Sequence, residues 1–400
     1  MLDTPRGTRL HIGLFGRRNS GKSSLINALT GQNTATVSAV PGTTTDPVYK
    51  PMEIKGLGPV VFIDTAGFDD EGDLGRLRVE RTEQAARETD IALLLFASAD
   101  MTAELNWLQQ LRQNKVKVIP VISRQDILPD TGLELQKAVE KTAGVSPLLV
   151  SARTGAGLAT LHEELLRALP EDYGVRSITG DLCRAGDTVV LVMPQDIQAP
   201  RGRLILPQVQ TLRELLDKGC QAVCCTTDRL ADTLNKLKSP PKLIITDSQA
   251  FKEVYAQKPA ESLLTSFSVL FAAYKGDMEY FLEGAERLFR LPQAARILIA
   301  EACTHKPLNE DIGRVKLPRL LRKKLGEDIA VTVVSGKDFP QDLRAFDMVI
   351  HCGACMFNRH YVLNRVSACK KQQIPMTNYG LAIAALLGIL PMVALPNEAK

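Results

Sequence analysis

Residues 10–24 read LHIGLFGRRNSGKSS, and this stretch decides the fold of the first part of the chain. The apolar run 10–15 is typical of a buried strand, and the glycine-rich segment after it leads into a helix that Gly31 ends. A strand, this glycine spacing and a helix together make a P-loop, in which backbone N–H groups at a helix N-terminus surround phosphate oxygens. We therefore expect an α/β domain with a mainly parallel sheet that binds a nucleotide.

The side chains of the P-loop have separate expected tasks. The ammonium of Lys22 reaches the β- and γ-phosphate oxygens, and the hydroxyl of Ser23 is a ligand of Mg²⁺. The predicted nucleotide-binding residues of this segment are Gly16, Asn19, Ser20, Gly21, Lys22, Ser23 and Ser24.

Two later segments follow in the order that a GTPase needs. In the polar stretch PGTTTD, residues 41–46, Thr44 can complete the coordination of Mg²⁺. Asp64 and Gly67 come directly after an apolar strand predicted over 60–63, so Asp64 can hold Mg²⁺ through water and the Gly67 N–H can sense the γ-phosphate. The expected catalytic residues are Lys22, Thr44, Asp64 and Gly67.

Two positions depart from the usual GTPase pattern. Residues 123–126 read SRQD where translational GTPases carry Asn-Lys-x-Asp, so Asp126 keeps the carboxylate for guanine while Ser123 predicts weaker base binding. Ser151 and Ala152 match the loop behind the base. Phe68 stands where small signalling GTPases place a water-orienting Gln, so we expect hydrolysis to be assisted in another way.

A second group of chemically reactive residues lies near the end of the chain. The stretch HCGAC, residues 351–355, and the stretch CTH, residues 303–305, each follow an apolar, β-branched run. We expect both stretches to be turns at the carboxyl ends of neighbouring strands, where open α/β sheets bind ligands. The candidate metal ligands are Cys303, Cys352 and Cys355, with His305 and His351 as candidates for a fourth position. Their spacing alone leaves zinc and an iron–sulfur cluster equally open.

The 400 residues predict two or three α/β domains. The expected boundaries are 1–170 for the P-loop domain, 171–265 for a connector without a catalytic constellation and 266–400 for the metal-ligand domain. The apolar run 266–273 is predicted to be a strand of the third domain. We expect the remaining cysteines to be structural: Cys183, Cys220, Cys224, Cys225 and Cys369.

Composition narrows the class of protein and its location. The net charge of +4, from 49 basic and 45 acidic residues, argues against nucleic acid or an anionic membrane as the main partner. The N-terminus lacks the blocks of a signal peptide, which predicts a cytoplasmic protein with reduced cysteines. The longest apolar run, 381–395, is shorter than a membrane span and contains Pro391, so it predicts a buried helix.

The order of these features resembles the FeFe-hydrogenase maturation GTPases, the HydF family, over the whole chain. The first domain, from Gly16 to Asn27 and in its Gly-Thr-Thr-x-Asp loop, is similar to tRNA-modification and Era-like GTPases. The resemblance implies a 4Fe–4S cluster on Cys303, Cys352 and Cys355, and a potassium ion at Asn19 that replaces an arginine finger. It also implies a dimerising connector, and a GTP-hydrolysing scaffold that receives a di-iron unit from two radical-SAM maturases and delivers it to apo FeFe-hydrogenase.

Two other interpretations remain open. A tRNA-modification or ribosome-assembly GTPase fits the first domain, although nothing downstream resembles an RNA-binding platform. A zinc-stabilised, GTP-dependent interaction switch fits the whole chain without iron chemistry. Metal analysis of anaerobically purified protein separates that switch from the scaffold.

Overall fold

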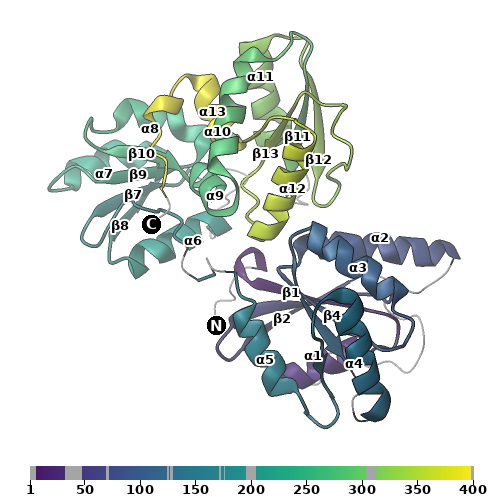
Figure 1. Cartoon of the computed structure of the whole chain (residues 1–400). Coiled ribbons are helices and arrows are strands. Elements are labelled where there is room, and N and C mark those ends of the chain that lie inside the picture. The colour runs from purple at the N-terminus through teal and green to yellow at the C-terminus, as the bar shows by residue number, and fades with distance from the viewer. Residues whose placement is uncertain are drawn as a thin grey trace. The chain divides into compact units, whose positions relative to one another are not determined.

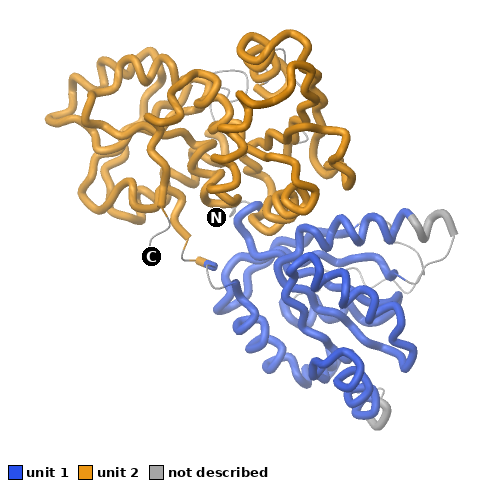
Figure 2. The backbone as a smooth tube through the Cα atoms, turned by 45° about the horizontal axis from the view of Figure 1, so that its top comes forward, with its two compact units in different colours: residues 1–173 blue, residues 174–400 orange. Residues whose placement is uncertain are grey.

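The computed structural model describes residues 6–31, 47–68, 72–123, 126, 129–170, 173–174, 176–194, 204–302 and 312–397. The chain divides into two compact units, residues 1–173 and 174–400, which Figure 2 colours separately. This division falls close to the predicted end of the P-loop domain at residue 170.

Unit 1 is built on a six-stranded sheet with strand order β2-β3-β1-β4-β5-β6. All neighbouring pairs are parallel except β2 with β3, which confirms the expected P-loop domain with a mainly parallel sheet. The strands are β1 (Leu10–Gly16), β2 (Val48–Ile54), β3 (Gly58–Asp64), β4 (Ile91–Phe96), β5 (Lys117–Ile122) and β6 (Leu148–Leu149).

Helices cover both faces of this sheet, as Figure 1 shows. One apolar cluster joins the sheet to α1 (Lys22–Thr30) and α5 (Leu158–Arg167). A second cluster, on the other face, contains residues of α3 (Thr102–Gln113) and α4 (Pro129–Ala143), and α2 (Gly72–Glu88) adds Ala86 to it. Because β1 is buried along its whole length, its carboxyl end delivers the phosphate loop from a fixed position.

Unit 2 contains two four-stranded, all-parallel sheets with the same topology. The first has the order β10-β9-β7-β8 and the second the order β12-β11-β13-β14. In each sheet the second strand lies on one side of the first and the third strand lies on the other side. Each sheet therefore has a topological switch point, where the chain leaves two neighbouring carboxyl ends in opposite directions. Ligands bind at such points in open α/β sheets. The strands are β7 (Thr188–Val192), β8 (Gln221–Cys225), β9 (Leu243–Thr246), β10 (Leu263–Ser266), β11 (Arg296–Glu301), β12 (Ala330–Ser335), β13 (Met348–His351) and β14 (Met376–Asn378).

The two sheets of unit 2 share one apolar core. A single cluster of buried side chains contains Val190 and Ile244 from the first sheet together with Leu298 and Ile350 from the second. The helices around them are α6 (Leu206–Asp217), α7 (Leu230–Lys236), α8 (Phe251–Gln257), α9 (Phe267–Lys275), α10 (Met278–Arg287), α11 (Leu317–Leu325), α12 (Arg359–Lys371) and α13 (Tyr379–Leu387).

One predicted element is wrong. The apolar run 266–273 is mostly the helix α9 rather than a strand, because β10 ends at Ser266 and the Ser266 side chain then accepts a hydrogen bond from the N–H of Val269. A serine that accepts this bond begins a helix. The helix lies between the two sheets (Figure 1), with Val269 in one apolar cluster and Leu270 in another, so it is apolar all round and lacks a helical stripe.

The C-terminal apolar run forms a short buried helix, α13, as expected. Within the part of the chain that the structure describes, no helix is both long and apolar enough to span a bilayer.

Candidate functional site

The phosphate loop connects the end of β1 to the start of α1. Asn19 and Gly21 have φ angles of 57° and 91°, so the backbone turns through the left-handed region that Gly adopts without strain and Asn tolerates. Lys22 is buried, and its Nζ donates to the carbonyl oxygens of Gly16 at 2.9 Å and Arg17 at 2.8 Å. The ammonium is therefore held within the loop that we expect to surround the phosphates.

The structure brings together two of the predicted Mg²⁺-binding residues. The Ser23 hydroxyl at the start of α1 donates to Asp64 Oδ2 at the end of β3, at 2.6 Å. Lys50 of β2, which the sequence analysis missed, places its Nζ 3.9 Å from the same oxygen. Burial lowers the pKa of Lys50, and the charge of Asp64 opposes that shift. Thr44 lies outside the described residues.

Ser123 has a definite role in the structure. At the end of β5, its buried hydroxyl donates to the carbonyl oxygen of Ser20 at 2.6 Å. This bond ties the base-recognition segment to the phosphate loop. The effect of Ser123 on guanine affinity stays a prediction.

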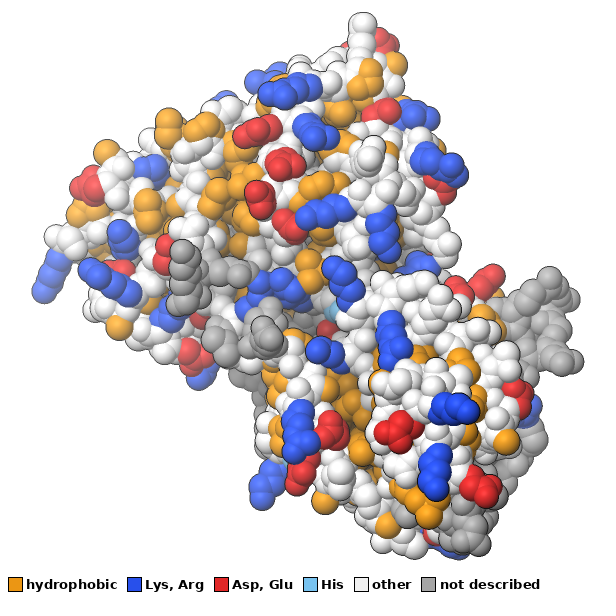
Figure 3. Space-filling view, viewed as in Figure 1, with side chains coloured by type: hydrophobic (Ala, Val, Ile, Leu, Met, Phe, Trp, Pro, Cys, Tyr) orange, Lys and Arg blue, Asp and Glu red, His pale blue; other side chains and the backbone are white. Residues whose placement is uncertain are grey.

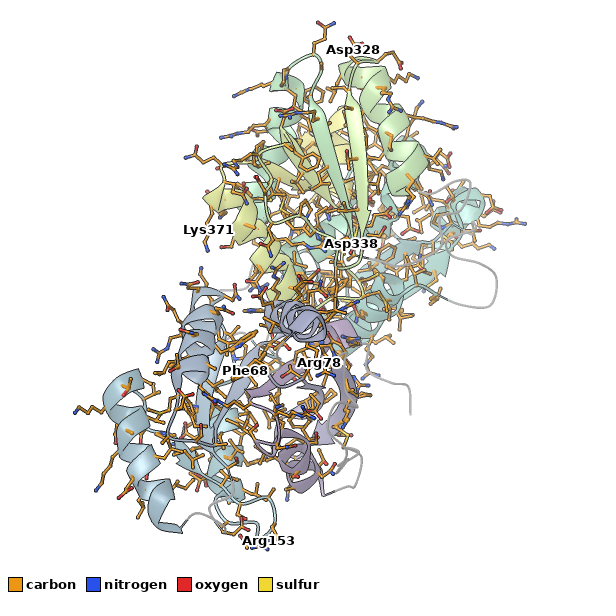
Figure 4. The ribbon with its side chains drawn as sticks, turned by 90° about the vertical axis from the view of Figure 1, so that its right-hand side faces the viewer. Phe68, Arg78, Arg153, Asp328, Asp338 and Lys371 are labelled. Atoms are coloured by element: carbon orange, nitrogen blue, oxygen red, sulfur yellow. The ribbon has the colours of Figure 1, made fainter. Side chains whose placement is uncertain are left out.

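The predicted base-binding carboxylate is held by two neighbours. Ser151 Oγ donates to Asp126 Oδ1 at 2.6 Å, and Arg153, labelled in Figure 4, lies 2.6 Å from Oδ2. The hydrogen bond from Ser151 is the largest cause that lowers the pKa of Asp126, and the charge of Arg153 adds to it. An ionised carboxylate is the acceptor that guanine N–H donors require. Ala152 lies between these two partners in the chain.

Phe68 is part of an apolar cluster and cannot orient water. Its ring stacks on Trp107 with a centroid separation of 5.7 Å, and Trp107 stacks in turn on Phe15 of β1 (Figure 4 labels Phe68). The side chain is 9% exposed. This packing anchors the chain directly after Gly67, whose backbone N–H is the predicted sensor of the γ-phosphate.

The second candidate site lies at the switch point of the second sheet of unit 2. β11 and β13 are parallel neighbours, with Ala300 opposite His351. The Ala302 N–H donates to Cys352 Sγ at 3.0 Å, and the Ala354 N–H approaches the same sulfur at 3.4 Å. The residue next to Cys303 in the chain thus contacts Cys352, as expected for two converging arms.

The thiol of Cys352 is in a partly buried, polar environment. Burial raises its pKa to about 11, while the N–H groups of Ala302 and Ala354 and the charge of Arg365 act against that rise. Cys303 and His305 lie outside the described residues. Among the residues that are described, no three His, Cys, Asp or Glu side chains gather as a metal site.

Both ring nitrogens of His351 are engaged. Nε2 lies 2.8 Å from Arg365 Nη1, and because a guanidinium can only donate, Nε2 accepts this bond. Nδ1 then carries the hydrogen and donates to the Cys352 carbonyl at 2.6 Å. Burial and the charge of Arg365 lower the pKa of His351 to about 3, so the ring is neutral. Metal ligation by His351 stays a prediction, and it requires one of these bonds to break.

Two buried cations near this site were missed by sequence reasoning. Lys275, at the end of α9, donates to the carbonyl oxygens of Ala354 at 2.9 Å and Phe357 at 2.6 Å. Arg365 lies on α12 and contacts His351. One sequence signal could have indicated Lys275: it is a charged residue at the end of the apolar run that forms α9.

Four of the other five cysteines occupy the places expected of structural residues, and Cys224, which is exposed, does not. Cys183, Cys220 and Cys369 are buried, and burial raises the pKa of Cys220 to about 11 and of Cys369 to about 12. Cys224 is exposed while its neighbour Cys225 packs against the shared core, as alternation along a strand requires.

The fold and the phosphate loop of unit 1 define a P-loop GTPase, and residues 11–124 match the family model described as 50S ribosome-binding GTPase. A domain of this class implies binding of GTP and Mg²⁺. Residues 178–276 match the hydrogen maturase F dimerization domain, and residues 279–395 match the hydrogen maturase F tetramerization domain. Together these two models span more than half of the 400 residues, and the chain belongs to the hydrogen maturase F family.

Curated relatives match about two fifths of the chain. The tRNA modification GTPase MnmE of Paraburkholderia xenovorans is 36% identical over 172 residues, which are 42% of this chain and 36% of that protein. The GTPase Der of Wolinella succinogenes is 36% identical over 171 residues, which are 40% of this chain and 36% of that protein. The chain thus spans about a third of the length of these relatives.

Two solved structures of Era are also similar. One, in complex with MgGDPNP and part of 16S ribosomal RNA, has 18% identity and a TM-score of 0.38, and the match covers 55% of this chain and 93% of that one. Another, from Aquifex aeolicus and bound to GDP and AlF4⁻, has 18% identity and a TM-score of 0.37, with coverage of 63% and 99%.

Proposed function

We propose that the protein is a GTP-hydrolysing scaffold of hydrogenase maturation. It binds a 4Fe–4S cluster through Cys303, Cys352 and Cys355, receives a di-iron unit and transfers that unit to apo FeFe-hydrogenase. Membership of the hydrogen maturase F family supports this proposal. The observation that carries it is the hydrogen bond from the Ala302 N–H to Cys352 Sγ, because it holds the chain next to Cys303 against the Cys352 sulfur.

The chemistry of the described residues fits an iron–sulfur centre. Cys352 and Cys355 share one tight turn, made possible by Ala354 with φ of 49°. Backbone N–H groups that donate to sulfur, as those of Ala302 and Ala354 do, stabilise thiolate ligands and tune the centres they hold. When bound through three thiolates, a cluster keeps one iron position at which a cargo can be attached.

Unit 1 would supply the nucleotide-dependent step. In this proposal Lys22 contacts the β- and γ-phosphates, and Ser23, Asp64 and Thr44 hold Mg²⁺. Asn19 would hold a potassium ion that takes the place of an arginine finger.

The protein would act as a homo-oligomer together with partner proteins. The dimerization and tetramerization domains would make the protein a homo-oligomer, and two radical-SAM maturases would be the donors of the di-iron cargo. We expect these steps to occur in the cytoplasm, without nucleic acid or membrane. In the space-filling view of Figure 3, Lys and Arg side chains and Asp and Glu side chains are both spread over the visible face.

The test is anaerobic reconstitution with iron and sulfide of the wild-type chain and of single Cys→Ala variants. Cys303→Ala, Cys352→Ala and Cys355→Ala should each lose most of the bound iron and the ability to activate apo-hydrogenase. Cys183→Ala and Cys369→Ala, which remove buried thiols outside this site, are the matched controls and should keep both.

Two results would contradict the scaffold proposal. Full iron occupancy in Cys303→Ala would show that Cys303 is not a ligand of the cluster. Stoichiometric zinc in the native protein would favour the zinc-stabilised interaction switch. The similarity to tRNA modification GTPases is found in about two fifths of the chain, whereas the hydrogen maturase F models match residues 178–276 and 279–395.

A further inference from the structure

Two buried cations approach the turn formed by residues 352–357, which we call the Cys turn. Lys275 comes from α9 and is 1% exposed, and Arg365 comes from α12 and is 3% exposed. Lysine and arginine are almost never buried to this extent unless they are paired with other groups. Their position therefore requires an explanation.

Lys275 binds the backbone of the Cys turn. Its Nζ donates to the carbonyls of Ala354 at 2.9 Å and Phe357 at 2.6 Å and lies 3.4 Å from the Cys355 carbonyl. These contacts place the Lys275 Nζ against the backbone that carries the two thiols.

Arg365 is surrounded by neutral groups. Its Nη1 donates to His351 Nε2 at 2.8 Å. Its Nη2 donates to the carbonyl of Gly336 at 2.5 Å and to the Tyr361 hydroxyl at 2.9 Å. The guanidinium carbon lies 4.8 Å and 4.6 Å from the ring centroids of Phe339 and Tyr361.

The charge of Arg365 has no described anion beside it. Within the described residues, no carboxylate forms an ion pair with its guanidinium, and its buried Nε has no hydrogen-bond partner. Burying a charge is costly unless an opposite charge compensates it. The buried guanidinium of Arg365 favours an anion nearby, and that anion would lie at the Cys turn. His351 connects the two, because it contacts Arg365 through Nε2 and the Cys352 carbonyl through Nδ1.

We propose that Lys275 and Arg365 are positioning residues that supply the counter-charge of a thiolate-ligated iron–sulfur centre on the Cys turn and raise its reduction potential. This inference rests on the proposed scaffold function. Reduction adds one negative charge to the centre, and nearby positive charges in a weakly polar interior favour the more negative state. Neutralising either cation should therefore make the centre harder to reduce.

The experiment is a redox titration, followed by electron paramagnetic resonance, of full-length protein reconstituted anaerobically. Lys275→Met and Arg365→Gln remove one charge each, while Lys275→Arg and Arg365→Lys keep it. Lys371→Met is the matched control, because Lys371 is an exposed cation on the same helix as Arg365 and is labelled in Figure 4. We expect the neutral variants to lower the ratio of reduced to oxidised centre at fixed potential about tenfold, which is a shift of about 59 mV for one electron.

Each outcome decides the question. An unchanged reduction potential with full iron in both neutral variants would overturn the counter-charge proposal. An equal shift of the potential in the charge-keeping variants would also overturn it, because the shift would then come from altered packing. If Lys275→Met loses its iron, the Arg365 variants decide, because Gln can still donate to His351 Nε2. If the neutral variants lose iron and the charge-keeping ones retain it, the charge is needed for assembly, and the proposal stands. A wild-type chain that binds no cluster overturns the scaffold function itself.

Discussion

At the scale of single residues, the hydroxyl of Ser123 joins base recognition to the phosphate loop. Ser123→Ala removes a donor and leaves the buried Ser20 carbonyl without that partner, so nucleotide affinity should fall by about 1 kcal/mol, roughly fivefold, for GTP and ATP alike. Asp126→Ala should instead weaken GTP by about 2 kcal/mol, roughly thirtyfold, and abolish its preference over ATP. Titration of each variant with both nucleotides measures this, and a loss of discrimination in Ser123→Ala would contradict the assignment.

Asn19 allows the potassium prediction to be tested without backbone strain. Because its φ is 57°, Asn19→Ala would mix strain with the loss of the amide, whereas Asn19→Gly keeps the conformation. We expect wild-type GTP hydrolysis to be faster in potassium than in sodium, since Phe68 cannot orient water. Asn19→Gly should hydrolyse GTP equally slowly in both salts, and Lys22→Ala should show no turnover. Steady-state phosphate release decides it, and equal wild-type rates in the two salts would refute the idea.

Residue roles could be predicted where they depend on neighbours in the chain. The positions of Lys22 and Ser23 follow from motif spacing, because a P-loop fixes its own geometry, whereas Asp64 lies 41 residues from Ser23 and was placed by the end of a predicted strand. Lys275 could not be found in this way, because its acceptors lie about 80 residues further along the chain. The role of Arg365 could not be predicted either, because its partners Gly336 and His351 come close to it only in the folded sheet.

At the scale of elements, the sequence did not distinguish a strand from a helix in every short apolar run. The strands expected over 10–15 and 60–63 were found, because each is an apolar run that ends at a polar or glycine-rich segment. The run 266–273 is also apolar, but Val269 is its one β-branched residue, and the cap made by Ser266 is a second local sign that it is helical. Its burial between two apolar clusters removes the polar face by which a helix is usually identified.

Gly284 shows how closely two elements of unit 2 approach. A Cβ at this position of α10 would overlap the backbone carbonyl of Met376 in β14, so Gly284→Ala should destabilise unit 2 by about 2 kcal/mol. Gly132→Ala in α4 is the matched control, because a Cβ there meets only Leu149 at 3.8 Å, and the helix should gain about 0.5 kcal/mol.

Urea unfolding can distinguish the two units. The single tryptophan, Trp107, reports on unit 1 by fluorescence, whereas far-ultraviolet circular dichroism reports on both units. Gly284→Ala should shift the dichroism transition and leave the fluorescence transition in place, and Gly132→Ala should affect the fluorescence transition. A fluorescence shift in Gly284→Ala would mean that the units do not unfold separately.

At the scale of the whole molecule, the neighbouring positions of β11 and β13 were predictable, and the core that the two sheets of unit 2 share was not. Parallel neighbouring strands end at the same edge, so the apolar runs before Cys303 and Cys352 predict that the two cysteine stretches lie close together. A site shared by Cys303 and Cys352 stays a prediction. The boundary expected at residue 265 falls inside β10, one residue before its end. No local composition marks the core that joins the two sheets of unit 2, because that core is made of side chains far apart in sequence.

That shared core predicts which fragments of the chain can fold. Residues 1–173 and 174–400 each contain whole apolar clusters, so each fragment should fold alone, the first binding GDP and the second binding iron after reconstitution. Division at residue 277, between the two matched domains, would instead split the cluster that contains Val190, Ile244, Leu298 and Ile350. The fragments 174–277 and 278–400 should then aggregate when expressed separately, because exposed apolar surface of this extent promotes association. Expression of the four fragments, followed by circular dichroism and size-exclusion chromatography, measures this. Two soluble, cooperatively unfolding halves of unit 2 would show that the shared core is not needed for either sheet to fold.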